Sequence, residues 1–163
     1  MFSFSPDPTA LKSELYEEIV QAALSLTEGE RDPIANMANI AALLSLYLAD
    51  LNWAGFYRVV ENELVLGPFI GKPACIRIAI GEGVCGAAVS EAKTQLVRDV
   101  HAFPGHIACD ADSRSELVVP IVQGGTVVAV IDLDSPIEAR FDEEDAAGIE
   151  RLAQAISDRV ASA

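Results

Sequence analysis

Three cysteines, Cys75, Cys85 and Cys109, are the residues of this sequence best suited to chemistry. No two of them have the Cys-x-x-Cys spacing of a dithiol redox motif or a zinc ribbon. His106 precedes Cys109 by three residues, but no second closely spaced ligand pair completes a metal site, so we expect none. Free cysteines are often small buried hydrophobes. That interpretation suits Cys75, at the start of a predicted strand, better than Cys109 in its polar loop, and composition alone leaves a redox role and a packing role open.

Three acidic residues are the second candidate for chemistry. Side chains alternate across a strand, so Asp132 and Asp134 point to the same face, in continuation of Val128 and Val130. Glu116, in the neighbouring strand region, can join them. A turn that leaves the strand explains Asp134 equally well, but it does not explain Asp132, which stands between two large apolar residues. Convergent carboxylates would bind an ammonium group, or raise one another's pKa so that one of them supplies a proton.

Trp53 is the only tryptophan, and it begins a stretch rich in aromatic residues. A tryptophan on a strand is usually part of the core, but it can also form an aromatic wall for a sulfur or methyl group. The sequence contains no Walker A, Rossmann, G-x-S-x-G or H-E-x-x-H motif. Nucleotide hydrolysis, hydride transfer and zinc proteolysis therefore have no support from motifs.

Three helices are expected at the two ends of the chain. Asp-Pro pairs at 7–8 and 32–33 each provide an N-cap followed by proline at the first helical position. Apolar residues then recur at helical spacing, which predicts helices over 7–28 and 32–50. A capping-box pattern predicts a C-terminal helix over 142–160.

The sheet and its loops are expected between residues 51 and 136. Alternating and β-branched runs predict strands, and Glu61-Asn62 and Gly124-Gly125 are turn signals between pairs of them. Pro120 favours an edge position or a bulge. Residues 101–113 form a long loop, which in a compact domain is usually functional. The predicted strands are Trp53–Val60, Leu64–Ile70, Ala74–Ile80, Gln95–Val97, Glu116–Val122 and Thr126–Asp134, with a short helix over Val84–Ala92.

Length and composition indicate one α+β domain spanning residues 1–163, with helices gathered at the ends of a largely antiparallel sheet. Apolar residues make up 51% of the chain, and 25 acidic against 11 basic residues give a net charge of −14. Such a surface repels phosphate backbones and anionic lipids, so nucleic acid and membranes are not expected as partners. The sequence shows no membrane span and no secretory signal, and the odd cysteine count argues against a structural disulfide framework. We expect a reduced, cytoplasmic protein.

Several motifs together resemble the free methionine-(R)-sulfoxide reductases, a family of stand-alone GAF-domain enzymes. The resemblance runs from residue 28 to the final helix, and the run FPGHIACD followed by SRSE is specific within GAF domains. The motifs are Asn52–Tyr57 (NWAGFY), Gly67–Phe69 (GPF), Gly71–Cys75 (GKPAC), Gly81–Gly86 (GEGVCG), Phe103–Asp110 (FPGHIACD), Ser113–Glu116 (SRSE) and Asp132–Pro136 (DLDSP).

This resemblance implies a GAF-like fold, with a six-stranded antiparallel sheet, N- and C-terminal helices packed on one side, and a small pocket beneath the Cys109 loop. It implies an oxidoreductase that reduces the R epimer of free methionine sulfoxide, a repair of oxidative damage, and leaves protein-bound sulfoxide alone. It also implies a homodimer formed through the terminal helices.

Site roles follow from the same resemblance. Cys109 matches the nucleophile and Cys75 the resolving thiol, with Cys85 as an alternative partner. The reaction would pass through a cysteine sulfenic acid and an intramolecular, redox-active disulfide. No bound cofactor is expected, because thioredoxin, supplied by NADPH and its reductase, would restore the thiols. Glu116, Asp132 and Asp134 match the positions that bind the ammonium and the sulfoxide oxygen, and Glu116 is also the expected proton donor. Trp53 matches the position that contacts the S-methyl group, and Tyr57 is a further lining residue.

Two alternatives belong to a different functional class. A GAF module that senses a small molecule would bind a ligand without chemistry, and a redox sensor would simply form a disulfide. The first does not need three thiols, and the second gives no role to the aspartates and Trp53. Consumption of NADPH in the presence of free methionine-(R)-sulfoxide and thioredoxin would distinguish the enzyme from both.

Overall fold

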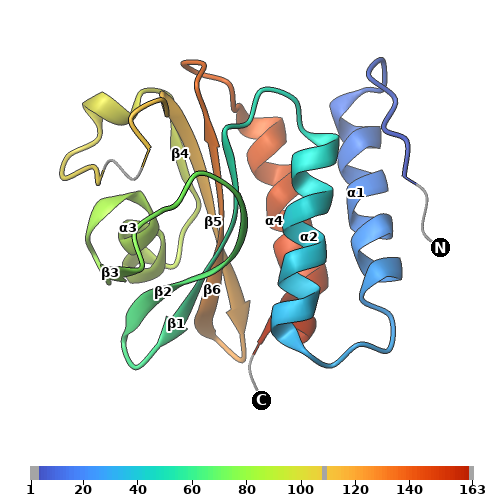
Figure 1. Ribbon diagram of the computed structural model, residues 1–163, viewed down its shortest axis with the longest axis horizontal. Coiled ribbons are helices and arrows are strands. Elements are labelled where there is room, and N and C mark those ends of the chain that lie inside the picture. The colour runs from blue at the N-terminus through green and yellow to red at the C-terminus, as the bar shows by residue number, and fades with distance from the viewer. Residues whose placement is uncertain (1–3, 108–109, 162–163) are drawn as a thin grey trace.

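A six-stranded antiparallel sheet in the order β3-β2-β1-β6-β5-β4 forms the centre of the molecule. The computed structural model describes residues 4–107 and 110–161. Helices α2 and α4 pack on one face of the sheet with α1 on their outer side, and α3 lies on the other face (Figure 1). The predicted fold class is therefore confirmed. The elements are α1 Lys12–Leu26, α2 Pro33–Tyr47, β1 Trp53–Val60, β2 Glu63–Gly71, β3 Arg77–Ala79, α3 Gly83–Glu91, β4 Gln95–Val97, a 3₁₀ turn Val100–Ala102, β5 Ser115–Gln123, β6 Thr126–Ser135 and α4 Glu143–Val160.

The start of the first helix differs from the prediction. Asp32 caps α2 as expected, since its carboxylate accepts hydrogen bonds from the backbone of Ile34 and Ala35. The carboxylate of Asp7, in contrast, accepts bonds from the backbone and hydroxyl of Thr9 and closes an isolated turn. An Asp-Pro pair suits a turn as well as a helix start. The prediction of a helix from residue 7 is therefore wrong, and α1 begins at Lys12.

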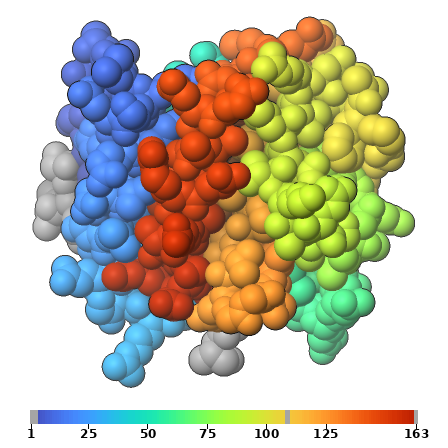
Figure 2. Space-filling model, turned by 180° about the vertical axis from the view of Figure 1, so that it is seen from behind, coloured from blue at the N-terminus to red at the C-terminus, as the bar shows by residue number. Residues whose placement is uncertain are grey.

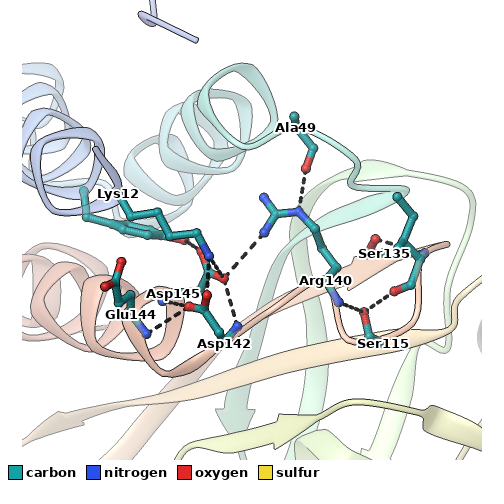
Figure 3. A network of polar contacts seen from close by, with 10 residues as sticks. Lys12, Ala49, Ser115, Ser135, Arg140, Asp142, Glu144 and Asp145 are labelled. Atoms are coloured by element: carbon teal, nitrogen blue, oxygen red, sulfur yellow. Dashed lines mark hydrogen bonds and ion pairs between the residues drawn. The ribbon is translucent and has the colours of Figure 1, made fainter. Parts of the chain in front are cut away.

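A polar network fixes α4 against α1 (Figure 3). Asp142 caps α4 in a capping box with Asp145, as its sequence indicates. Lys12 donates to both carboxylates, at 2.7 and 2.8 Å, and the Tyr16 hydroxyl donates to Asp145 at 2.8 Å. Gly148 lies flush against the ring of Tyr16, so the two helices approach closely. Viewed from behind, α1 and α4 lie side by side (Figure 2).

The third strand is shorter than predicted, because pairing extends only over Arg77–Ala79 rather than over the whole segment from residue 74 to 80. One further hydrogen bond runs from the Leu66 N–H to the carbonyl of Ile76 at 2.9 Å, and Pro68, further along β2, lacks the N–H that a longer ladder needs. The carbonyl of Cys75 instead accepts a hydrogen bond from the Tyr57 hydroxyl at 2.9 Å. Cys75 consequently lies in a loop, and its placement at the start of a strand is wrong.

Each face of the sheet has its own apolar cluster. The larger cluster lies between the sheet and the helices α1, α2 and α4, and the smaller one lies beneath α3, around Trp53, Tyr57 and Val130. Pro120 was expected at a sheet edge or at a bulge. In the structure β4 pairs only with Glu116–Val118, so β5 has no neighbour on that side at Pro120, and a register shift follows between Ile121 and Val122. Among the described residues, no helix has the length and apolar character needed to cross a membrane.

Candidate active site

Three strands bring acidic and aromatic side chains into one cross-strand row on the face covered by α3. Glu116 of β5 lies opposite Asp134 of β6, and Asp134 lies opposite Trp53 of β1. Asp132 lies one step further along the same face of β6, opposite Gly55. A Cβ at Gly55 would stand 2.4 Å from that of Phe69, so glycine is needed there for β2 to approach.

Burial gives these carboxyl groups unusual proton affinities. Glu116 and Asp132 are only 7% and 6% exposed. Desolvation, followed by the charges of Asp132 and Asp134, holds the pKa of Glu116 well above its ordinary value. Desolvation raises the pKa of Asp132 to about 6 and that of Asp134 well above its usual range. The raised pKa values favour retention of a proton in the cluster, while Asp132, whose pKa rises least, is the group best placed to serve as a carboxylate.

Cys85 extends the cluster from the first turn of α3. Its Sγ lies within 4.8 Å of carboxylate oxygens of Glu116 and Asp132. Desolvation and the Asp132 charge raise the pKa of the Cys85 thiol well above its ordinary value. These three groups lie close enough to share a cation, but they could bind one only after losing their protons, which burial without a cation disfavours.

Aromatic rings form one wall beside the carboxylates. The Trp53 indole stacks on Phe69, with centroids 5.1 Å apart, and lies 6.0 Å from the ring of Tyr57. The indole N–H donates to the carbonyl of Lys72 at 3.2 Å. Hydrogen bonds at Trp53 and at the Tyr57 hydroxyl thus hold the chain after β2 against this wall.

Two adjoining cavities open onto these side chains. Their volumes are about 400 and 230 Å³, including space open to solvent, and they share Tyr57, Asp110, Asp132 and Asp134. The larger cavity is also lined by Ile78, Glu82, Gly83, Val84, Cys85, His106, Ile107, Ser113 and Glu116, and the smaller by Trp53, Lys72, Pro73 and Ala74.

A polar network that the sequence did not predict anchors the loop before β5. The Asn52 side-chain amide donates to the carboxylate of Asp110 at 3.1 Å and to the Ser113 hydroxyl at 3.0 Å. A hydrogen bond from the backbone N–H of Asp112, together with bonds from the side chains of Asn52 and Lys72, keeps the pKa of Asp110 below its ordinary value, so its carboxylate is charged. His106 lies with Nε2 3.8 Å from a Glu116 oxygen. The only sequence signal for this network was the unusual length of the loop.

Comparison with known proteins places the chain in a family. The GAF domain profile matches residues 35–161. Free methionine-R-sulfoxide reductase of Escherichia coli is 48% identical over 86% of this chain and 86% of its own length. The chain belongs to the free methionine-R-sulfoxide reductase family.

Solved structures of this family share the whole fold. The Neisseria meningitidis reductase in complex with its substrate is 42% identical, with a TM-score of 0.93 over 98% of this chain and 96% of that one. A Staphylococcus aureus enzyme of the family, also solved with substrate, is 47% identical, with a TM-score of 0.86 over 97% of this chain and 100% of that one.

The structure brings together most of the site residues expected for a methionine-R-sulfoxide reductase. Glu116, Asp132, Asp134, Trp53 and Tyr57 all line the two cavities. Cys85 lines the larger cavity, and Cys75 lies half-buried in the loop bonded to Tyr57. Cys109 lies outside the described residues, so its expected role is carried only by the sequence.

Proposed function

We propose that this protein reduces free methionine-R-sulfoxide to methionine, with a cysteine thiolate as the immediate reductant. Its membership of an oxidoreductase family supports the reaction class. The observation that carries the proposal is the buried Glu116, whose raised pKa keeps a proton available beside a cation-binding carboxylate and an aromatic wall. Reduction of a sulfoxide by a thiol requires such a proton on the departing oxygen.

In the proposed reaction, the thiolate of Cys109 attacks the sulfoxide sulfur while Glu116 protonates its oxygen. The oxygen leaves the substrate and ends on Cys109 as a sulfenic acid. The methionine sulfur gains the two electrons that the cysteine sulfur loses. The Cys75 thiol then condenses with the sulfenic acid, releases water and forms a disulfide, which thioredoxin reduces by exchange.

Substrate binding would use the remaining members of the cluster. The carboxylate of Asp132 is buried, and the described residues that bond to it, Cys85 and Glu116, leave its Oδ1 without a further donor, so the substrate ammonium would complete its hydrogen bonding. The same ammonium would lower the raised pKa of Asp134 and draw that carboxyl group into its charged form. The S-methyl group would lie against Trp53, with Tyr57 as a further lining residue.

The environment of Cys85 argues against a role as nucleophile. The thiolate is the reactive form of cysteine, and burial beside carboxylates raises the pKa of this thiol. Cys85 is retained only as the alternative resolving partner.

Single-turnover analysis of cysteine variants tests the proposal. Without reductant, the wild-type enzyme and a Cys75→Ser variant should each form one methionine per active site, whereas Cys109→Ser should form none. With thioredoxin, its reductase and NADPH, only the wild-type enzyme and the control variant Cys85→Ala should continue to turn over. One methionine per site from Cys109→Ser would overturn the assignment of the nucleophile. Binding of the sulfoxide without NADPH consumption by the wild-type protein would instead favour a sensing module.

A further inference from the structure

The two cavities are markedly poor in positive charge. Among the described residues that line them, Lys72 is the only lysine or arginine, whereas five of the lining residues are acidic. A free amino acid brings a carboxylate as well as an ammonium group. That carboxylate would be repelled by the acidic lining unless a cation met it.

The backbone at Lys72 is held in place at the edge of the aromatic wall. The Trp53 indole N–H donates to the Lys72 carbonyl at 3.2 Å, and Pro73 fixes the backbone that follows. A Cβ at Gly71 would lie 2.5 Å from Cδ1 of Trp53, and Gly71 has a φ of +143°. The glycine therefore lets the chain pass flush against the indole and fixes where the lysine begins.

The ammonium of Lys72 has donor capacity to spare. Its Nζ contacts the carboxylates of Asp110, at 3.2 Å, and of Asp112. An ammonium group has three donors, so these contacts leave one for a ligand. The side chain is 61% exposed and therefore accessible, whereas the Asp110 side chain is only 6% exposed.

Lys72 is also close to the expected ammonium site. The charge of Asp110, which pairs with Lys72, contributes to the raised pKa of Asp134. In a free amino acid, the carboxylate and the ammonium are attached to the same carbon atom. A receptor for one must therefore lie beside the receptor for the other, as Lys72 does with respect to Asp134 in the smaller cavity.

We propose that Lys72 binds the α-carboxylate of the substrate and is a specificity-determining residue of this site. This inference rests on the proposed function. Together with Asp132 and Asp134, Lys72 would make recognition depend on an unmodified carboxylate and an unmodified ammonium on one carbon. A methionine sulfoxide within a peptide has neither.

The test compares two substrates, free methionine-R-sulfoxide and its decarboxylated analogue 3-(methylsulfinyl)propylamine of the same sulfur configuration. Lys72→Met should lower kcat/KM for the free amino acid roughly 10- to 100-fold, mainly through KM, which is the range for a hydrogen bond between charged groups. The same variant should leave kcat/KM for the amine unchanged, because that substrate lacks the carboxylate. Lys72→Arg should retain most of the activity, since it keeps the charge.

Two further variants separate recognition from a structural effect. Lys93→Met removes an exposed lysine beside α4, outside both cavities, and should change neither substrate's kinetics. Asp112→Asn removes an exposed partner of Lys72 and leaves the lysine in place, so it should not reproduce the loss. Equal losses on both substrates in Lys72→Met would overturn the proposal and assign Lys72 to holding the loop. A wild-type enzyme that reduces neither substrate would instead overturn the proposed function.

Discussion

Glu116 and Asp132 belong to one buried cluster, yet they suit different tasks. The pKa of Glu116 is raised by desolvation and by two neighbouring carboxylates, whereas that of Asp132 rises only to about 6. Of the two groups, Asp132 therefore ionises more readily and Glu116 holds its proton more tightly. Carboxyl groups whose environments move their pKa values apart can act as acid and as anion in the same site.

This division predicts different kinetic effects for two amide substitutions. Glu116→Gln should lower the saturating single-turnover rate by roughly 10²- to 10⁴-fold, the usual loss when a general acid is removed. Asp134→Asn should mainly raise KM, because it removes a contact to a group that does not react. Single-turnover rates measured against substrate concentration check both. A normal saturating rate with a raised KM in Glu116→Gln would make Glu116 a binding group rather than the acid.

The same burial predicts that the acidic cluster costs stability as pH rises. A carboxyl group whose pKa is raised by folding stabilises the fold fully below its unfolded pKa, and this contribution is lost as pH rises through the folded pKa. For Asp132 that window extends from about 4 to about 6. Asp132→Asn should therefore gain unfolding free energy relative to wild type between pH 4.5 and pH 8, by roughly 1–3 kcal/mol. Urea denaturation of both proteins at each pH measures their difference in unfolding free energy. If that difference were the same at pH 4.5 and pH 8, the prediction would be contradicted.

Among the secondary-structure elements, the α1–α4 contact supports the sheet from the face opposite the site. Asp145 is buried and joins Lys12 and Tyr16 across the two helices. Arg140, just before α4, adds a contact to Asp145 and donates to the carbonyl of Ala49 (Figure 3). The helical layer is thus tied to the segment that leads into β1.

Gly148→Ala should weaken this contact. The added Cβ would lie 2.1 Å from Cγ of Tyr16, so the helices must move apart. Overpacking of this kind usually costs about 1–3 kcal/mol, more than the helix propensity gained by replacing glycine. Denaturant unfolding measures the loss, with Gln154→Ala on the exposed face of α4 as the control. Unchanged stability in Gly148→Ala would contradict the prediction and show that the two helices can accommodate the added Cβ without cost.

At the scale of the whole molecule, the helical layer leaves apolar side chains exposed away from the site. Leu46 on α2 is 53% exposed. We expect two copies to associate through the helices, as the family resemblance implies. Sedimentation at micromolar concentration should show a dimer, and Leu46→Glu should shift it towards monomer because burial of a new charge is costly. A monomeric wild-type protein would contradict this expectation.

Much of this arrangement was determined by the sequence alone, because it depends on local rules. The capping residues Asp32 and Asp142 act within a few residues, and so do the turns that close the two hairpins. The two-residue period of a strand places Asp132 and Asp134 on one face regardless of what surrounds them. Where two local rules compete, as at Asp7, the sequence pattern predicted a helix and the structure has a turn.

Only the tertiary structure decided which distant residues meet. The pairing of β6 with both β1 and β5 places Glu116, Asp134 and Trp53 in one row, and no local spacing encodes that order. The bond from Asn52 to Asp110 and the position of Lys72 beside them depend on the same packing. The proton affinities also arise there, because desolvation and neighbouring charges exist only once the chain encloses the carboxylates. Local interactions thus determined the elements, and long-range packing determined the chemistry of the site.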